Sequence, residues 1–221
     1  MLRTPTIPLT EKLPYDFDLR LNHPVSTHAV QFQLIPVGSR VLDVGCHTGI
    51  LGAALKEKKQ CEVIGIDNDE RAIAVAGDRL DSVRLVNLEV DSWSDLMLTL
   101  GLANFDIILF GDVIEHTREP QQILSEARKL LKPGGKVIVS LPNVANLRVR
   151  LGLLFGNFDY GDSGILDKSH LRFFTQKSAR ELVGEAGYKI VAERYSGYSL
   201  PKWLIDAMPT LFAVNIILVG E

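Results

Sequence analysis

Two glycines mark the part of this chain best suited to holding a small ligand. The apolar residues 41–44 end at Gly45, Gly49 follows, and a helix-type pattern begins at Ile50. Glycine has no Cβ, so its backbone can turn tightly and approach a ligand closely. The first turn of a helix presents unpaired N–H groups and a partial positive charge. A strand, a glycine-rich loop and a helix N-terminus in this order predict a nucleotide-type binding site.

An aspartate at the end of the next apolar run completes this pattern. Asp67 closes residues 62–67 and follows the glycine loop by about 20 positions, where dinucleotide sites carry the acidic residue that binds ribose. Its two carboxylate oxygens match the two hydroxyls of a ribose. The alternative is that Asp67 caps the following helix, and Asn68 suits either role.

A third group of polar residues follows the apolar run 105–110. We expect Asp112, Val113 and His116 at the rim of the same site, because ligands bind at the carboxyl ends of parallel strands. Histidine can remove a proton near neutral pH, so His116 is the leading candidate for a general base. The alternative is a histidine that packs or caps a helix. The five histidines are scattered along the sequence, so no metal site is predicted.

The elements that must position these residues alternate along the chain. Strands are predicted at 40–44, 62–67, 83–90, 105–110 and 136–141, and helices at 50–59, 69–80, 95–100 and 120–131. This alternation predicts a parallel sheet with right-handed crossovers and helices on both faces. A helix at 176–186 and strands at 188–195 and 213–220 close the chain. The predicted fold is therefore α/β: a Rossmann-like, doubly wound, seven-stranded, mostly parallel sheet with an antiparallel edge strand.

Two segments outside this alternation are candidates for contacting a substrate. Residues 1–37 are predicted to form an N-terminal arm with a candidate lid helix at 25–34, and residues 38–221 the main domain. Residues 143–175 contain Asn, Gly, Asp and aromatic residues without a sustained period, and long connections in compact domains tend to be functional. We expect this insertion to cover the substrate.

Composition narrows the choice of partners. The 221 residues are 46% hydrophobic, which suits one domain with a sizeable core. The net charge of −3 favours a small-molecule partner over nucleic acid.

No apolar stretch approaches the roughly 20 residues that span a bilayer and no signal peptide is recognised, so we expect a soluble cytoplasmic protein without membrane insertion. Cys46 and Cys61 would lie at opposite ends of adjacent strands, which predicts two free thiols.

Six sequence blocks carry a family resemblance when they are taken in order. They lie at 41–49, 63–67, 90–91, 105–116, 130–135 and 170–175. Together they resemble class I S-adenosylmethionine-dependent methyltransferases, in the methyltransferase-domain branch similar to ubiquinone-pathway O-methyltransferases. The similarity covers residues 38–195. One position departs from the pattern, because His47 stands where the family usually has glycine.

The resemblance implies S-adenosylmethionine as the cofactor. Asp43 would help to hold its amino group, Asp67 its ribose and Asp91 its adenine. For Asp91, the alternative is a surface turn, with Trp93 filling the core. His170 is a weaker catalytic candidate at the substrate pocket, and the alternative leaves it at the surface. The full set of implied cofactor-binding residues is Asp43, Gly45, Cys46, His47, Gly49, Asp67, Asn68, Asp91, Ser92, Asp112 and Val113.

The expected reaction is O-methylation of a small molecule or a saccharide intermediate. Such a transfer needs two molecules held in line, and a base only if the acceptor loses a proton. One alternative is a nicotinamide-dependent oxidoreductase, but residues 45–52 lack the GxGxxG order. Another alternative is a non-catalytic binding protein that kept the fold. His47, at a position where the family usually has glycine, supports this alternative.

Overall fold

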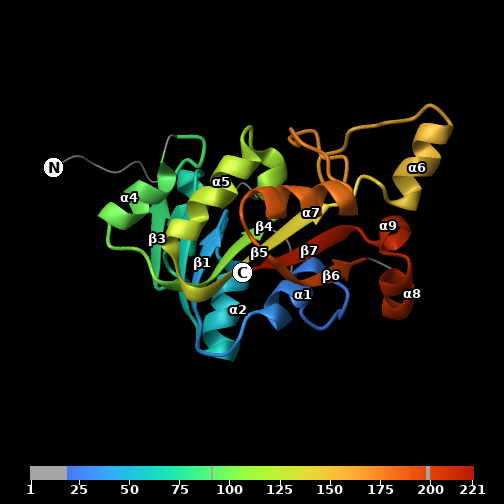
Figure 1. The fold of residues 1–221 in the computed structure, drawn as a ribbon. Coiled ribbons are helices and arrows are strands. Elements are labelled where there is room, and N and C mark those ends of the chain that lie inside the picture. Colours follow the sequence, from blue (N-terminus) through green and yellow to red (C-terminus); the bar gives the residue numbers. More distant parts are fainter. Residues whose placement is uncertain (1–18, 91, 198–199) are drawn as a thin grey trace.

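One mixed sheet runs through the molecule in the computed structural model, which describes residues 19–90, 92–197 and 200–221. Within these residues seven strands pair in the order β3-β2-β1-β4-β5-β7-β6 (Figure 1). The strands are β1 (Arg40–Val44), β2 (Glu62–Asp67), β3 (Ser82–Leu85), β4 (Phe105–Gly111), β5 (Leu131–Pro142), β6 (Ile190–Ser196) and β7 (Asn215–Gly220). The reversed strand is β7, which runs antiparallel to both β5 and β6. The predicted fold is confirmed, with the reversed strand lying one position in from the edge strand β6.

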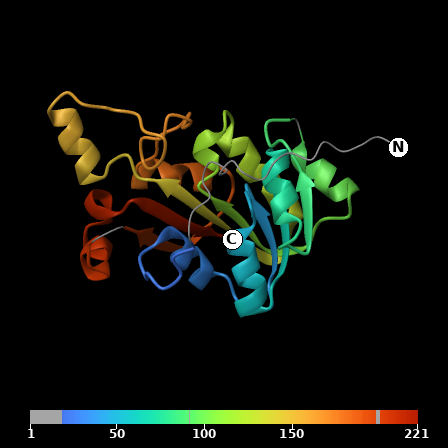
Figure 2. The same cartoon turned by 180° about the vertical axis from the view of Figure 1, so that it is seen from behind.

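Helices cover both faces of this sheet (Figures 1 and 2). One face packs against α1 and α2 through a core that includes Val30 and Leu55. The other packs against α4, α5 and α7 through Trp93, Leu124 and Val183. The helices are α1 (Thr27–Leu34), α2 (Ile50–Lys59), α3 (Glu70–Ala76), α4 (Trp93–Thr99), α5 (Pro120–Ala127), α6 (Leu147–Leu154), α7 (Gln176–Glu185), α8 (Lys202–Ala207) and α9 (Pro209–Phe212), with 3₁₀ turns η1 (Ile114–His116) and η2 (Arg128–Leu130).

Helix α3 begins at a different cap from the one predicted. A carboxylate oxygen of Asp69 accepts hydrogen bonds from the backbone N–H groups of Arg71 and Ala72, at 2.8 and 3.3 Å. Asp69 is therefore the N-cap, and the proposed capping role of Asn68 is wrong. The helix also ends at Ala76, four residues earlier than predicted.

Strand β3 is shorter than predicted, because a turn follows it. It ends at Leu85, whereas the alternating pattern predicts a strand to residue 90. The side chain of Asn87 accepts a hydrogen bond from the backbone N–H of Glu89 at 2.9 Å. A local bond of this kind offers the backbone an alternative to the sheet.

A helix that the sequence pattern does not predict lies in the 143–175 insertion. The side chain of Asn146 accepts from the backbone N–H of Arg148 at 3.0 Å and caps α6. Only Val149 of this helix is buried, while Leu151 and Leu154 are exposed. Because the leucines of α6 do not share one buried face, the helix shows no apolar stripe of period 3.6.

The described part of the N-terminal segment packs onto the domain. Ser26 caps α1, since its hydroxyl accepts from the backbone N–H of Ala29 at 3.2 Å. None of the helices in the described residues is long and apolar enough to cross a membrane. Cys46 and Cys61 are both buried free thiols, as predicted.

Candidate active site

The glycine loop joins β1 to α2 at the carboxyl edge of the sheet. Gly45 and Gly49 have φ angles of +69° and +73°, which favour glycine. The backbone N–H of Gly45 donates to the carbonyl of Ile66 at 2.8 Å, which ties the loop to the end of β2. A Cβ on Gly45 would clash with the side chain of Val113, the residue after Asp112. The loop and the chain after β4 therefore lie in direct contact.

His47 occupies the position where the family pattern has glycine. Its φ of +47° is the left-handed conformation that glycine adopts easily, so the loop keeps its shape with a larger residue. Its Nε2 atom is buried and has no hydrogen-bond partner among the described residues, and the same holds for the hydroxyl of Thr48. Buried polar atoms in native proteins are normally paired, so these two atoms are exceptions within the loop.

Asp67 connects this loop to the next helix. One carboxylate oxygen accepts from the backbone N–H of His47 at 2.8 Å, and the other accepts from the backbone N–H of Asp69 at 2.9 Å. Each oxygen has two lone pairs, so one acceptor position on each is left for a ligand. Asn68 is exposed beside it. Asp67 thus combines the loop-stabilising role with an acceptor geometry that suits a pair of ribose hydroxyls.

Asp43 lies beneath the loop at the end of β1 and is only 5% exposed. Burial, and then the negative charge of Asp67, raise the pKa of its carboxyl group to about 7. A cation placed against Asp43 would relieve this cost. The ammonium group of an amino-acid ligand meets that requirement, so Asp43, the loop and Asp67 fit S-adenosylmethionine. Burial also raises the pKa of the Cys46 thiol, which keeps it neutral.

The adenine region is described only in part. Asp91 lies outside the described residues. Ser92 has a φ of +61° and precedes α4. Trp93 is 1% exposed within the hydrophobic core, so it fills the core and does not flank an adenine ring.

Asp112, at the end of β4, is hydrogen-bonded to residues at the ends of β5 and β7. Its Oδ1 atom accepts from the Ser140 hydroxyl at 2.5 Å and from the Asn215 side-chain amide at 2.6 Å. Burial raises the pKa of Asp112, while the Ser140 hydrogen bond and the nearby His28 act in the opposite direction. Because these partners belong to β5, β7 and α1, Asp112 fixes the rim of the site at the end of β4.

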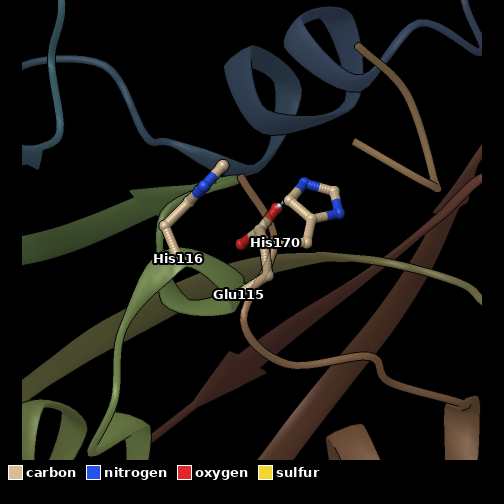
Figure 3. Close-up of side chains that lie close together, drawn as sticks. All are labelled: Glu115, His116 and His170. Carbon is tan, nitrogen blue, oxygen red and sulfur yellow. Dashed lines mark ion pairs between the residues drawn. The ribbon is translucent and has the colours of Figure 1, made fainter. Parts of the chain in front are cut away.

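A second polar cluster lies on the same rim and contains both predicted catalytic residues. His116 and Glu115 come from η1, and His170 comes from the 143–175 insertion (Figure 3). The His116 and His170 ring centroids are 4.8 Å apart. The carboxylate of Glu115 points toward His170, with 3.9 Å between Oε1 and Nε2. The backbone carbonyl of Glu115 holds the insertion in place by accepting from the N–H groups of Leu171 and Arg172, at 2.9 and 3.0 Å.

The electrostatics of this cluster favour neutral groups. Glu115 is fully buried, and burial followed by the charge of Asp112 raises the pKa of its carboxyl group well above the ordinary value. Burial, and then the neighbouring His116, lower the pKa of His170. A neutral imidazole offers one nitrogen lone pair, so His170 can accept a proton or bind a cation. The surface alternative for His170 is wrong, because its side chain is only 5% exposed.

A separate hollow of about 440 Å³ lies between α6 and α7. Its walls include Arg150, Gln176 and Arg180. It contains no residue of the glycine loop, Asp67 or η1, so it does not correspond to the site described above.

Comparison with known proteins places this chain in a family. A family model described as a methyltransferase domain matches residues 20–193, which is most of the chain. The chain therefore belongs to the S-adenosylmethionine-dependent methyltransferases, and S-adenosylmethionine is the cofactor of that family. This membership favours a methyltransferase over the oxidoreductase alternative.

Two curated relatives are similar to parts of this chain. A ubiquinone biosynthesis O-methyltransferase of Coxiella burnetii is 35% identical over 125 residues, covering 57% of this chain and 53% of the relative. A demethylmenaquinone methyltransferase of Shouchella clausii is 26% identical over 179 residues, covering 74% of this chain and 76% of the relative. The chain spans about half the length of the first of these relatives.

Solved structures agree with the fold. A methyltransferase from Archaeoglobus fulgidus is 16% identical with a TM-score of 0.60, and covers 88% of this chain and 94% of its own. A Burkholderia thailandensis 1,6-didemethyltoxoflavin-N1-methyltransferase, solved with bound 1,6-didemethyltoxoflavin and S-adenosylhomocysteine, is 18% identical with a TM-score of 0.59. The match covers 92% of this chain and 78% of that chain. At these identities the similarity concerns the fold alone.

Proposed function

We propose that this chain transfers a methyl group from S-adenosylmethionine to a hydroxyl group of a small molecule. The observation that carries the proposal is the close approach of Gly45 to Val113. Val113 directly precedes η1, so the glycine loop lies beside η1. A cofactor-binding half and a half able to handle protons therefore share one edge of the sheet. The O-methyltransferase named among the curated relatives supports oxygen as the methylated atom. A saccharide acceptor, which the sequence also suggests, is included in the proposal.

The cofactor half is assigned to two side chains and the loop backbone. Asp43 accepts hydrogen bonds from the amino group, and Asp67 accepts from the ribose hydroxyls. The N–H groups at the start of α2 face the carboxylate. Cys46, His47, Asn68, Asp91 and Ser92 remain proposed neighbours of the same ligand. When bound, S-adenosylmethionine supplies an electrophilic methyl group on a positively charged sulfur.

The acceptor half is assigned to the Glu115, His116 and His170 cluster. A hydroxyl must lose its proton as the new carbon–oxygen bond forms. We propose His116 as the group that accepts this proton, with His170 beside it as a second candidate. Helix α1 and the insertion at 143–175 are proposed to cover the acceptor and exclude water, which supports the orientation on which the rate depends.

A binding and turnover experiment tests this function. Isothermal titration with S-adenosylmethionine should give one site per chain, while NADH should not compete. Incubation with small phenols, quinols and sugar intermediates should then yield S-adenosylhomocysteine. Binding without turnover on every acceptor would favour the non-catalytic alternative. Preferential binding of NADH would favour the oxidoreductase.

A further inference from the structure

We propose that Glu115, His116 and His170 form a binding site for one divalent transition-metal cation of the zinc class. Each side chain offers one ligand atom, and these three atoms lie within 4.8 Å of one another. A cation there would join η1 to the insertion through His170 (Figure 3). The sequence gives no sign of this site, because 54 positions separate His116 from His170 (170 − 116).

The distances suit a site that closes around a cation. Two ligands about 2.1 Å from a tetrahedral metal lie about 3.4 Å apart. The Glu115 Oε1 and His170 Nε2 atoms are already at 3.9 Å. Bringing all three atoms from within 4.8 Å to this separation requires shifts of about 1 Å, which small side-chain rotations supply.

Glu115 provides the observation that points most directly to a ligand. Its side chain is 0% exposed, and neither carboxylate oxygen has a hydrogen-bond partner among the described residues. Buried carboxylates are normally paired or bound to a metal. Both oxygens of Glu115 are therefore available to a cation positioned between it and the two rings.

The backbone orients both imidazoles for binding. The Nδ1 atom of His170 lies 3.1 Å from the carbonyl of Ile165. The Nδ1 atom of His116 lies 3.3 Å from the carbonyl of Ser169 and 3.2 Å from its hydroxyl. A carbonyl accepts only from N–H, so it favours the tautomer with the proton on Nδ1 and the lone pair on Nε2. Metal-binding histidines are commonly held in this way.

The ligand set selects the class of cation. Two imidazoles and one carboxylate suit Zn²⁺, Co²⁺, Mn²⁺ or Fe²⁺, whereas Mg²⁺ and Ca²⁺ prefer oxygen ligands. Three protein ligands leave at least one coordination position open, as in catalytic metal sites. A metal on Nε2 would occupy the lone pair of His116, so His116 would no longer accept the proton. The cation would instead bind the acceptor oxygen at its open position and lower the pKa of the hydroxyl, whose proton would pass to water. This last consequence depends on the proposed function, but the binding site itself does not.

A metal titration of the full chain tests the site. After treatment with a chelator, titration with Zn²⁺ should show one site per chain, and Co²⁺ should give a visible absorption band that Zn²⁺ abolishes. His170→Ala, His116→Ala and Glu115→Gln should each weaken Zn²⁺ binding at least tenfold. His23→Ala, which removes an exposed histidine, should leave it unchanged. Mg²⁺ and Ca²⁺ should not compete.

Two controls separate loss of the site from loss of the fold or of the proposed function. Each variant is also titrated with S-adenosylmethionine, and binding equal to that of the unchanged chain shows that the cofactor half is folded. Zn²⁺ should slow hydrogen exchange of residues 161–173, because it joins them to η1. The proposal is overturned if the unchanged chain does not bind Zn²⁺, or if all three variants bind it as well as His23→Ala does. Absence of methyl transfer would refute the proposed function and leave the Zn²⁺ titration unaffected.

Discussion

Asp67 accepts a hydrogen bond from the backbone N–H of His47 at 2.8 Å, so the acidic residue of β2 shapes the glycine loop of β1. The same carboxylate accepts from Asp69 and thereby fixes the start of α3. This arrangement gives Asp67 two roles: it sets the loop conformation, and it presents acceptor positions at the rim.

Asp67→Ala should weaken S-adenosylmethionine binding by about 1–3 kcal/mol, because it removes charged acceptors. Titration calorimetry measures the change. Asp78→Ala removes an exposed aspartate from the same part of the chain and serves as the control, with no expected effect. Equal affinity in both variants would refute the ribose assignment.

Gly45→Ala should lower the free energy of unfolding by about 2–4 kcal/mol. The change adds a methyl group against Val113 and imposes a left-handed φ on alanine. Gly101→Ala is the matched control, since Gly101 has a φ of +72° and open space around its Cβ position. It should cost only about 1–2 kcal/mol.

Adding Val113→Ala to Gly45→Ala should recover part of the loss, because it removes the methyl groups that clash. Urea unfolding of the single and double variants measures this recovery. If Gly45→Ala and Gly101→Ala are equally destabilising, the close approach of the loop to Val113 contributes nothing to the loss of stability in Gly45→Ala.

The raised pKa of Asp43 predicts a fall in stability with rising pH. The unfolded carboxyl group releases its proton near pH 4, whereas the folded one holds it to about pH 7. The folded state binds more protons between these values, so the free energy of unfolding decreases across that window, by a few kcal/mol. Asp43→Asn should remove this decrease. Parallel slopes of unfolding free energy against pH for the two proteins would contradict the assignment.

His116→Ala should lower kcat about 10²-fold or more once an acceptor is found, while S-adenosylmethionine affinity stays within twofold. We propose that this residue lies on the acceptor side of the site, as proton acceptor or as cation ligand. Full turnover in this variant would exclude both roles.

The proposed cofactor half can be predicted from the sequence because its residues are local. Gly45 and Gly49 follow β1 and Asp67 ends β2, and parallel pairing brings those strand ends together. The acceptor half depends on contacts between distant segments. The carbonyl of Glu115 accepts from two N–H groups of the insertion beside His170, and no sequence period predicts that contact.

The elements that the sequence misses have a similar explanation. Helix α6 exposes most of its leucines, so it lacks the one-sided pattern that reveals a helix packed on a core. Asp69 and Asn68 are adjacent and both suit an N-cap, so only the geometry separates them.

A crystal structure of the chain with S-adenosylhomocysteine tests the central claim most directly. We predict that the ribose hydroxyls lie within hydrogen-bond distance of the Asp67 carboxylate, and that the amino group lies beside Asp43, under the loop at Gly45. A ligand bound elsewhere, or a ribose turned away from Asp67, would contradict it.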